Sequence, residues 1–207
     1  MKVLFKLLII ILIVVFVLFA IAYGLIYSRL GTDYEKYIDS VEKYSKEYDV
    51  DPRLVMAIIK TESGFKEKAQ SHMGAVGLMQ LLPETADWVT DQMGIEYKES
   101  MLTDSDYNIM IGTYYLRYLF NYFKSEDLAI LAYNGGPGNV SKWIESGIIT
   151  SNPASYKKIP VEETKEYIIK VKENKLMISR IWDDIINTKG LSQWKRTFIF
   201  MKTSLSN

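Results

Sequence analysis

One carboxylate, Glu62, occupies an unusual position within residues 58–65, IIKTESGF. The preceding pair Asp51-Pro52 predicts a helix start, with an aspartate N-cap and proline at the first helical position. At about 100° per residue, the side chain of Glu62 then shares one helix face with three aliphatic residues, Val55, Ile58 and Ile59. The spacing therefore predicts a glutamate on the core-facing side of a helix.

This position has a chemical consequence. Apolar neighbours desolvate the ionised carboxylate and raise its pKa, which is the property that a general acid needs near neutral pH. Helical glutamates are more often solvated or paired with a cation, and ionised glutamate is almost never fully buried without a partner. From these residues alone, a catalytic acid and an ordinary helix-edge glutamate both remain open.

The composition excludes several classes of site. The chain has 207 residues, of which 48% are hydrophobic and 24% charged, which is ordinary for a globular protein. Its 25 basic and 25 acidic residues cancel, so the charge balance does not favour nucleic-acid binding. The sequence has no cysteine and a single histidine, His72, which argues against a thiolate or histidine metal site and against a Ser-His-Asp triad. An enzyme built from this chain has to use carboxylates, tyrosines and amides.

The N-terminal residues predict a membrane anchor. Residues 7–27, LLIIILIVVFVLFAIAYGLIY, carry no charge and span the roughly 30 Å hydrocarbon core at about 1.5 Å per residue. Lys2 and Lys6 precede this stretch, so the positive-inside rule predicts an extracytoplasmic location for the rest of the chain. The alternative is a signal peptide cleaved near Ala22, because Ala20-Ile21-Ala22 resembles a small-x-small cleavage site. We expect residues 1–28 to be an uncleaved single-pass anchor.

The rest of the sequence predicts an all-α fold without strand alternation. We expect residues 29–50 to form a helical stalk, residues 51–186 the main globular domain and residues 187–207 a tail. Helix-start and helix-stop residues predict helices at about 33–48, 52–63, 83–93, 103–124, 125–133, 140–145 and 161–186, with a polar loop at 151–160.

The tail combines basic and aromatic residues. It contains four cations and no acid, with four apolar residues between them: Lys189, Lys195, Arg196 and Lys202, and Trp194, Phe198, Ile199 and Phe200. Such a segment binds an anionic membrane or wall surface, or packs back on the globular domain. The sequence leaves both interpretations open.

Three further stretches follow the Glu62-Ser63 pair in order. They are SHMGAVGLMQLLPETA at residues 71–86, LAYNGGPG at residues 131–138 and IPVEETKEYIIKV at residues 159–171. Together these four motifs resemble the soluble-lytic-transglycosylase (SLT) family of peptidoglycan-cleaving enzymes, over most of the chain from about Asp51 to Val171. The resemblance implies a lysozyme-like catalytic domain within residues 51–186.

The resemblance also implies roles for individual residues. Glu62 corresponds to the single catalytic acid and base of the family, and no metal or cofactor is implied. The residues that correspond to substrate-binding positions are Ser63, Ser71, Met79, Gln80, Tyr133, Asn134, Glu163 and Tyr167. A simple packing role is an open alternative for Met79 and for each tyrosine, and either tyrosine is a candidate to hydrogen-bond Glu62.

The implied reaction is cleavage of the β-1,4 bond between N-acetylmuramic acid and N-acetylglucosamine. The muramic acid 6-hydroxyl attacks the anomeric carbon, which gives a 1,6-anhydro end, and Glu62 acts first as acid and then as base. A lysozyme-type hydrolase and a catalytically idle module that tethers a wall-spanning assembly to glycan are the alternatives. The expected partners are peptidoglycan strands and, through residues 7–27, the membrane; the sequence names no protein partner.

Overall fold

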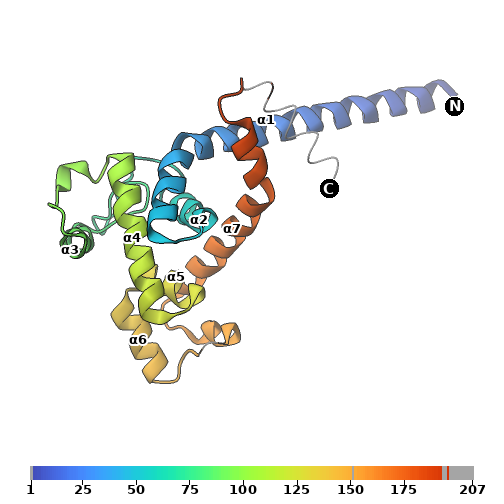
Figure 1. The fold of residues 1–207 in the computed structure, drawn as a ribbon. Coiled ribbons are helices and arrows are strands. Elements are labelled where there is room, and N and C mark those ends of the chain that lie inside the picture. The colour runs from blue at the N-terminus through green and yellow to red at the C-terminus, as the bar shows by residue number, and fades with distance from the viewer. Residues whose placement is uncertain (1, 151, 193–194, 196–207) are drawn as a thin grey trace. The chain divides into compact units, whose positions relative to one another are not determined.

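A computed structural model describes residues 2–150, 152–192 and 195 of the chain. Its helices are α1 (Lys2–Tyr48), α2 (Pro52–Ser63), α3 (Pro83–Met93), α4 (Ser105–Phe123), α5 (Glu126–Gly135), α6 (Pro137–Glu145) and α7 (Glu162–Thr188), with short 3-10 helices η1 (Glu99–Met101) and η2 (Pro153–Lys158) (Figure 1). Within the described residues, β-pairing is limited to two isolated bridges, Gln70–Val76 and Val76–Leu81. The expected all-α class is confirmed.

The chain divides into two compact units. The first contains residues 1–36 and 181–207, and the second contains residues 37–180. Helices α1 and α7 each pass from one unit into the other. All of the candidate site residues belong to the second unit.

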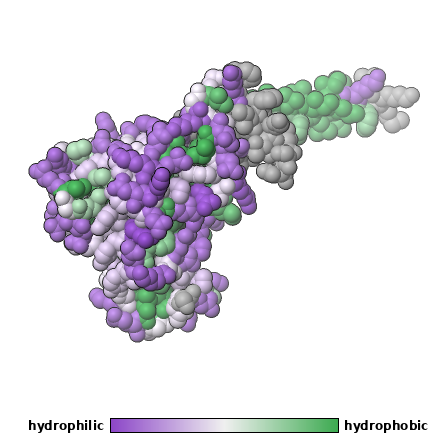
Figure 2. All heavy atoms as spheres, in the orientation of Figure 1, coloured by the Kyte–Doolittle hydropathy of each residue, from purple (hydrophilic) through white to green (hydrophobic). Residues whose placement is uncertain are grey.

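The first unit contains the apolar part of α1. The stretch Phe5–Ala22 has a mean hydropathy of 3.2 and is long and apolar enough to cross a membrane. Its side chains are exposed, and Figure 2 shows them as a continuous apolar surface along this part of the helix. Helix α7 extends to Thr188, two residues beyond the expected domain end, and Trp194, Arg196 and residues 198–202 of the basic-aromatic tail lie outside the described residues.

The second unit is built around α2. Six consecutive residues of this helix, 54–59, have no exposed surface, because other helices of the unit surround it on several sides. The expected capping is present: the side chain of Asp51 accepts a hydrogen bond from the Arg53 amide, and Gly64 adopts the left-handed conformation, φ 56°, that ends the helix. The start and end of α2 therefore agree with the sequence prediction.

Three other boundaries differ from the prediction. The apolar segment and the expected stalk form one continuous helix, α1, in place of two elements. Residues 153–158 form η2 within the expected polar loop, where the side chain of Asn152 accepts a hydrogen bond from the Ala154 amide and caps the turn. Helix α6 begins at Pro137, before the expected residue 140, because proline is favourable in the first turn of a helix.

Candidate active site

Helix α2 presents Glu62 at its C-terminal end, one residue before Ser63. The carboxyl group is half-buried, and its Oε1 atom accepts a hydrogen bond of 2.7 Å from the phenol of Tyr167 on α7. The hydroxyl of Ser63 instead donates to the carbonyl of Ile59, at 3.1 Å, within its own helix. Of the Glu62-Ser63 pair, the structure therefore directs only the glutamate toward α7.

The surroundings of Glu62 raise the pKa of its carboxyl from 4.5 to about 7. Burial is the largest cause, because desolvation penalises the charged form. The Tyr167 hydrogen bond acts in the opposite direction, and the nearby negative charge of Glu163 raises the pKa further. A carboxyl group with this pKa populates both the protonated and the ionised form near neutral pH.

The two tyrosines of the motifs have different partners. The Tyr167 phenol binds Glu62, whereas the Tyr133 phenol donates to the backbone carbonyl of Met79 at 2.9 Å. Burial, with the nearby Glu62 charge as the second cause, raises the pKa of both phenols well above 10. Both tyrosines therefore stay protonated and act as hydrogen-bond donors at neutral pH.

Residues 77–80, GLMQ, belong to a loop that is held by hydrogen bonds from its own polar side chains; we call it the GLMQ loop. Gln80 has a left-handed backbone, φ 47°, and its Nε2 atom donates to the carbonyls of Ala69 (3.1 Å) and Gly77 (2.9 Å). The Oγ atom of Ser71 accepts hydrogen bonds from the amides of Met73 and Ala75. Within the described residues, the Gln80 Oε1 atom has no hydrogen-bond partner, and it remains able to accept one from a ligand.

Met79 lies in the core beside the site. Its side chain has no exposed surface and packs so closely on α4 that a Cβ atom at Gly112 would overlap its sulfur. This burial supports the packing alternative for the side chain. The backbone of Met79 contributes to the site instead, through the carbonyl that accepts the Tyr133 hydrogen bond.

Sequence reasoning missed the residue that holds this loop, Asn108 on α4. Asn108 is fully buried, and its Oδ1 atom accepts from the Met79 amide at 2.7 Å. Its Nδ2 atom donates to the carbonyls of Val76 (3.1 Å) and Leu102 (2.8 Å). Asn108 lies three and seven residues before Ile111 and Tyr115, so a polar residue on an apolar helix face, the same pattern that identified Glu62, was the available signal.

The motif at residues 131–138 contacts the motif at residues 159–171 through Asn134. The Oδ1 atom of Asn134, near the end of α5, accepts a hydrogen bond of 2.7 Å from Thr164 on α7. Thr164 is buried, whereas its neighbour Glu163 is exposed. The structure thus brings α2, the GLMQ loop, α5 and the N-terminal half of α7 together around Glu62.

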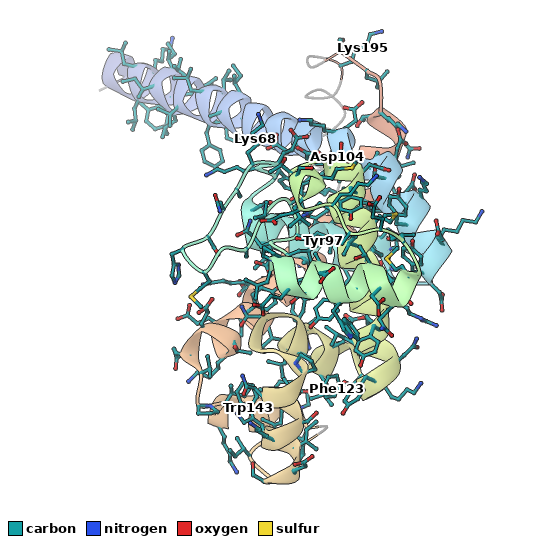
Figure 3. The ribbon with its side chains drawn as sticks, turned by 90° about the vertical axis from the view of Figure 1, so that its left-hand side faces the viewer. Lys68, Tyr97, Asp104, Phe123, Trp143 and Lys195 are labelled. Carbon is teal, nitrogen blue, oxygen red and sulfur yellow. The ribbon has the colours of Figure 1, made fainter. Side chains whose placement is uncertain are left out.

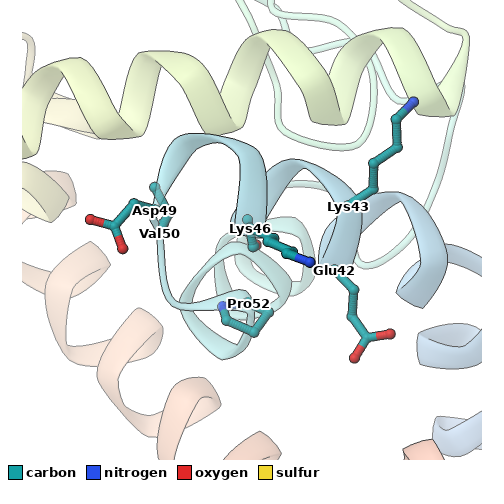
Figure 4. Close-up of a pocket in the computed structure, with 7 residues that line it drawn as sticks. Glu42, Lys43, Lys46, Asp49, Val50 and Pro52 are labelled. Atoms are coloured by element: carbon teal, nitrogen blue, oxygen red, sulfur yellow. The ribbon is translucent and has the colours of Figure 1, made fainter.

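The cavity of about 620 Å³ shown in Figure 4 lies elsewhere in the second unit. It is lined by Glu42, Lys43, Ser45, Lys46, Asp49, Val50 and Pro52, at the end of α1 and the start of α2. None of these residues belongs to the four motifs. Within residues 2–150, 152–192 and 195, no group of three or more histidine, cysteine or acidic side chains is placed to hold a metal ion.

Known proteins resemble the chain in sequence. The model of the family described as "Transglycosylase SLT domain" matches residues 39–150, so the third motif lies outside the matched range. The soluble lytic murein transglycosylase of Salmonella typhimurium is 34% identical over 170 residues, 78% of this chain and 26% of that protein. The membrane-bound lytic murein transglycosylase C of Serratia proteamaculans is 33% identical over 177 residues, 74% of this chain and 49% of that protein.

Solved structures resemble the chain in fold. The lytic transglycosylase Slt of Pseudomonas aeruginosa, in an inactive glutamate-to-glutamine mutant, is 29% identical with a TM-score of 0.65, over 70% of this chain and 24% of that one. The 70 kDa soluble lytic transglycosylase of Escherichia coli is 34% identical with a TM-score of 0.63, over 67% of this chain and 23% of that one. The expected lysozyme-like architecture is confirmed, and the chain spans about a quarter to a half of the length of these relatives.

Proposed function

The chain belongs to the transglycosylase SLT domain family, and on this premise we propose that it is a lytic transglycosylase of peptidoglycan. The bond that it cleaves is the β-1,4 link between N-acetylmuramic acid and N-acetylglucosamine. The observation that carries this proposal is the carboxyl of Glu62, whose pKa is raised to about 7 and which is bound by the phenol of Tyr167. The relatives named lytic transglycosylases, one of them an inactive glutamate-to-glutamine mutant, support the assignment.

The proposed reaction uses one carboxyl twice. Protonated Glu62 donates its proton to the glycosidic oxygen as the bond from that oxygen to the muramic acid anomeric carbon breaks, through an oxocarbenium-like state. The 6-hydroxyl of the same muramic acid then forms a new bond to the anomeric carbon, and its proton passes to ionised Glu62. No water is consumed, and the carboxyl returns to its starting form.

The other motif residues are proposed to bind and orient the glycan. Tyr167 fixes the orientation of the Glu62 carboxyl, and its hydrogen bond stabilises the ionised form that acts as base. The free Oε1 of Gln80, the Nδ2 of Asn134 and the hydroxyl of Ser71 are proposed to bind sugar hydroxyl and acetamido groups. Tyr133 acts indirectly, because its phenol donates a hydrogen bond to the backbone carbonyl of Met79, the residue before Gln80.

A hydrolase is the second candidate, and Glu163 is the reason to keep it. Ordinary glycosidases use two carboxylates, and the charge of Glu163 acts on Glu62 strongly enough to raise its pKa. The other acids in or near the motifs are not among the causes of this shift. Glu67 accepts a hydrogen bond from Ser105 on α4, and Glu84 lies in the first turn of α3. Glu162 and Glu166 form ion pairs with Lys165 and Lys170 on their own helix. An exposed Glu163 that activates a water molecule would give a muramidase.

The test is a digest of isolated peptidoglycan by the full chain in detergent micelles, with the products identified by mass spectrometry. We expect muropeptides that are lighter than hydrolytic products by one water molecule. Glu62→Gln is expected to lower their formation by a factor of about 10³ or more, because it removes the proton donor and leaves the fold intact. Glu173→Gln, at an exposed glutamate on α7, is the matched control and should retain full activity.

The product masses separate the alternatives. Reducing-end products that disappear with Glu163→Gln would identify a hydrolase and overturn the proposal. Binding to peptidoglycan without any cleavage by the wild type would instead identify the tethering module.

We further propose that residues 7–27 anchor the enzyme as a single-pass helix and that the second unit lies outside the cytoplasm. The exposed apolar surface of α1 and the name of the membrane-bound Serratia relative support this arrangement. In cells that express the full chain with a C-terminal tag, we expect the tag in the membrane fraction and accessible to protease in spheroplasts. A soluble product shortened near Ala22 would show signal cleavage instead.

A further inference from the structure

A row of aromatic side chains leads away from Tyr133 along α4. The ring of Tyr133 lies 5.5 Å from that of Tyr115, which lies 6.4 Å from the ring of Trp88 on α3. The Trp88 ring is 4.8 Å from that of Tyr118, and the row continues to Tyr122 at 6.3 Å and to Phe123 at 4.8 Å. We call Trp88, Tyr118, Tyr122 and Phe123 the aromatic strip.

The rings of this row differ in exposure. Tyr115, next to Tyr133, is only 7% exposed, whereas Trp88 is 39% and Tyr122 58% exposed. Tyr118 and Phe123 are half-buried. The inner end of the row is therefore ordinary core packing, but the aromatic strip is at the surface. Figure 3 looks onto the face that α3 crosses, with Phe123 on the same side at the end of α4.

The surface position of the strip is not explained by packing within the chain. Tyr115, Tyr118 and Tyr122 recur at helical spacing on one face of α4, and Trp88 extends that face onto α3. Folding buries large aromatic side chains where it can, and exposed aromatic clusters mark interaction sites. A ligand that covers the exposed rings would supply the missing burial.

The polar groups of the strip indicate what kind of ligand fits. Within the described residues, no hydrogen bond or ion pair involves the Trp88 indole N–H or the phenols of Tyr118 and Tyr122, so these groups are available to a ligand. The strip combines apolar ring faces with neutral donors at their edges and contains no charged side chain. A pyranose ring has the matching surface, with C–H groups on its faces and hydroxyl and acetamido groups around its rim.

We propose that the aromatic strip is a secondary glycan-binding surface that holds a part of the peptidoglycan strand away from the bond being cleaved. The occupant is the sugar chain itself. The argument for it is proximity together with the matching chemistry, because a single buried ring, Tyr115, contacts both Trp88 of the strip and Tyr133 beside the site. From Tyr118 to Phe123 the helix rises about 7.5 Å, which is long enough for one sugar ring. This inference rests on the proposed function for the identity of its ligand.

A surface of this kind has a specific consequence for affinity. The proposal requires that a short oligosaccharide at Glu62 leaves the strip empty, whereas a long strand occupies the site and the strip together. The second contact then acts at high effective concentration and slows dissociation. The ratio of the affinities for long and short glycans therefore measures the contribution of the strip.

The test measures binding by the full chain in detergent micelles, with Glu62→Gln present throughout to prevent cleavage. The probes are peptide-free glycan tetrasaccharides and glycan strands several times longer, both of alternating N-acetylglucosamine and N-acetylmuramic acid. The test variant is Trp88→Ala combined with Tyr122→Ala; both side chains are exposed and their loss leaves the core in place. The control is Tyr114→Ala, a half-buried tyrosine of the same helix whose ring contacts Tyr48 outside the strip.

We expect the double variant to weaken binding of the long strands about tenfold, as the loss of two aromatic contacts predicts. Its affinity for the tetrasaccharide should stay within about twofold of the parent value, and the control should bind both probes as the parent does. An unchanged affinity for long strands, or an equal loss for both probes, would overturn the proposal. So would a loss of self-association without a loss of glycan binding, since the occupant would then be a second copy of the chain.

These outcomes are separable from a failure of the proposed function. The wild-type digest reports the reaction, and the Glu62→Gln titration reports the strip. Hydrolytic products together with length-dependent binding would refute the transglycosylase and leave the strip supported. Anhydro products together with length-independent binding would support the transglycosylase and refute the role of the strip.

Discussion

The phenol of Tyr167 on α7 and the carboxyl of Glu62 on α2 are joined by a hydrogen bond of 2.7 Å, although 105 positions separate the two residues. Two opposing influences meet at this carboxyl. Burial and the charge of Glu163 raise its pKa, and the Tyr167 hydrogen bond lowers it. The resulting pKa of about 7 is thus adjustable in either direction by a single substitution.

Tyr167→Phe should move the alkaline limb of the activity profile upward. The phenol stabilises the ionised form of Glu62, so its removal favours the protonated acid. A hydrogen bond to a charged group contributes about 1.5 kcal/mol or more, which corresponds to about one pH unit. The measurement is kcat/KM against pH on soluble glycan, where the midpoint reports the free enzyme. We expect a lower maximal rate as well, because the carboxyl loses its fixed orientation.

Glu163→Gln should move the same limb downward. It removes a negative charge that raises the pKa of Glu62, so the acid loses its proton at a lower pH. Glu163 is exposed, and its effect is therefore screened by salt, whereas the Tyr167 effect is a direct contact. Shifts of opposite sign, with only the Glu163→Gln shift shrinking at high ionic strength, are the expected result. Shifts in the same direction would contradict our assignment of the two roles.

Local signals in the sequence predict much of this architecture. Asp51, Pro52 and Gly64 set the limits of α2, and the apolar face that they define is enough to predict the raised pKa of Glu62. Asp104 likewise caps α4, and Gly94 ends α3. These features depend on residues within a few positions of one another, which is why sequence reasoning reaches them.

Features that depend on distant residues are not accessible in the same way. Either Tyr133 or Tyr167 is a candidate partner for Glu62 in the sequence, and only the placement of α7 against α2 selects Tyr167. Met79 is a packing residue because α4 approaches it at Gly112, 33 positions later. The continuity of α1 past Gly31 escapes prediction for a different reason: a helical glycine costs only about 1 kcal/mol, which is too little to break a long helix.

The stability of the protein should depend on the pH through Glu62. The carboxyl has a pKa of about 7 when folded and an ordinary value of 4.5 when unfolded, so between these values the folded state binds more protons. The free energy of unfolding therefore falls as the pH rises from about 4.5 to 7. Glu62→Gln removes this penalty, and we expect it to stabilise the protein by about 2 kcal/mol at pH 8 and hardly at all near pH 4.

Thermal unfolding followed by near-ultraviolet circular dichroism at a series of pH values is the measurement. Glu173→Gln serves again as the control, and its Tm should match the wild type across the series. A Tm for Glu62→Gln that lies below the wild type at pH 8 would show that the ionised carboxyl is stabilising, contrary to the desolvation argument.

The loop that carries Gln80 should depend on Asn108. Asn108→Ala leaves the Met79 amide and the carbonyls of Val76 and Leu102 without their partner, and we expect a loss of stability of about 3 kcal/mol. Asn121→Ala, at an exposed asparagine of the same helix, should change stability by less than about 0.5 kcal/mol. The unfolding free energies of the two variants test this part of the prediction.

A positioning role for Asn108 requires more than a loss of stability. Asn108 holds the amide of Met79, and the carbonyl of the same residue accepts the Tyr133 hydrogen bond, so both contacts act on one stretch of backbone. Well below the Tm, Asn108→Ala and Tyr133→Phe should each lower kcat about tenfold, and the double variant should lose little more than either alone. Effects that multiply in the double variant would mean that Asn108 and Tyr133 act on the site separately and not through one stretch of backbone, because independent contributions to the barrier add as free energies. An unchanged kcat in Asn108→Ala would mean that Asn108 acts only through general stability.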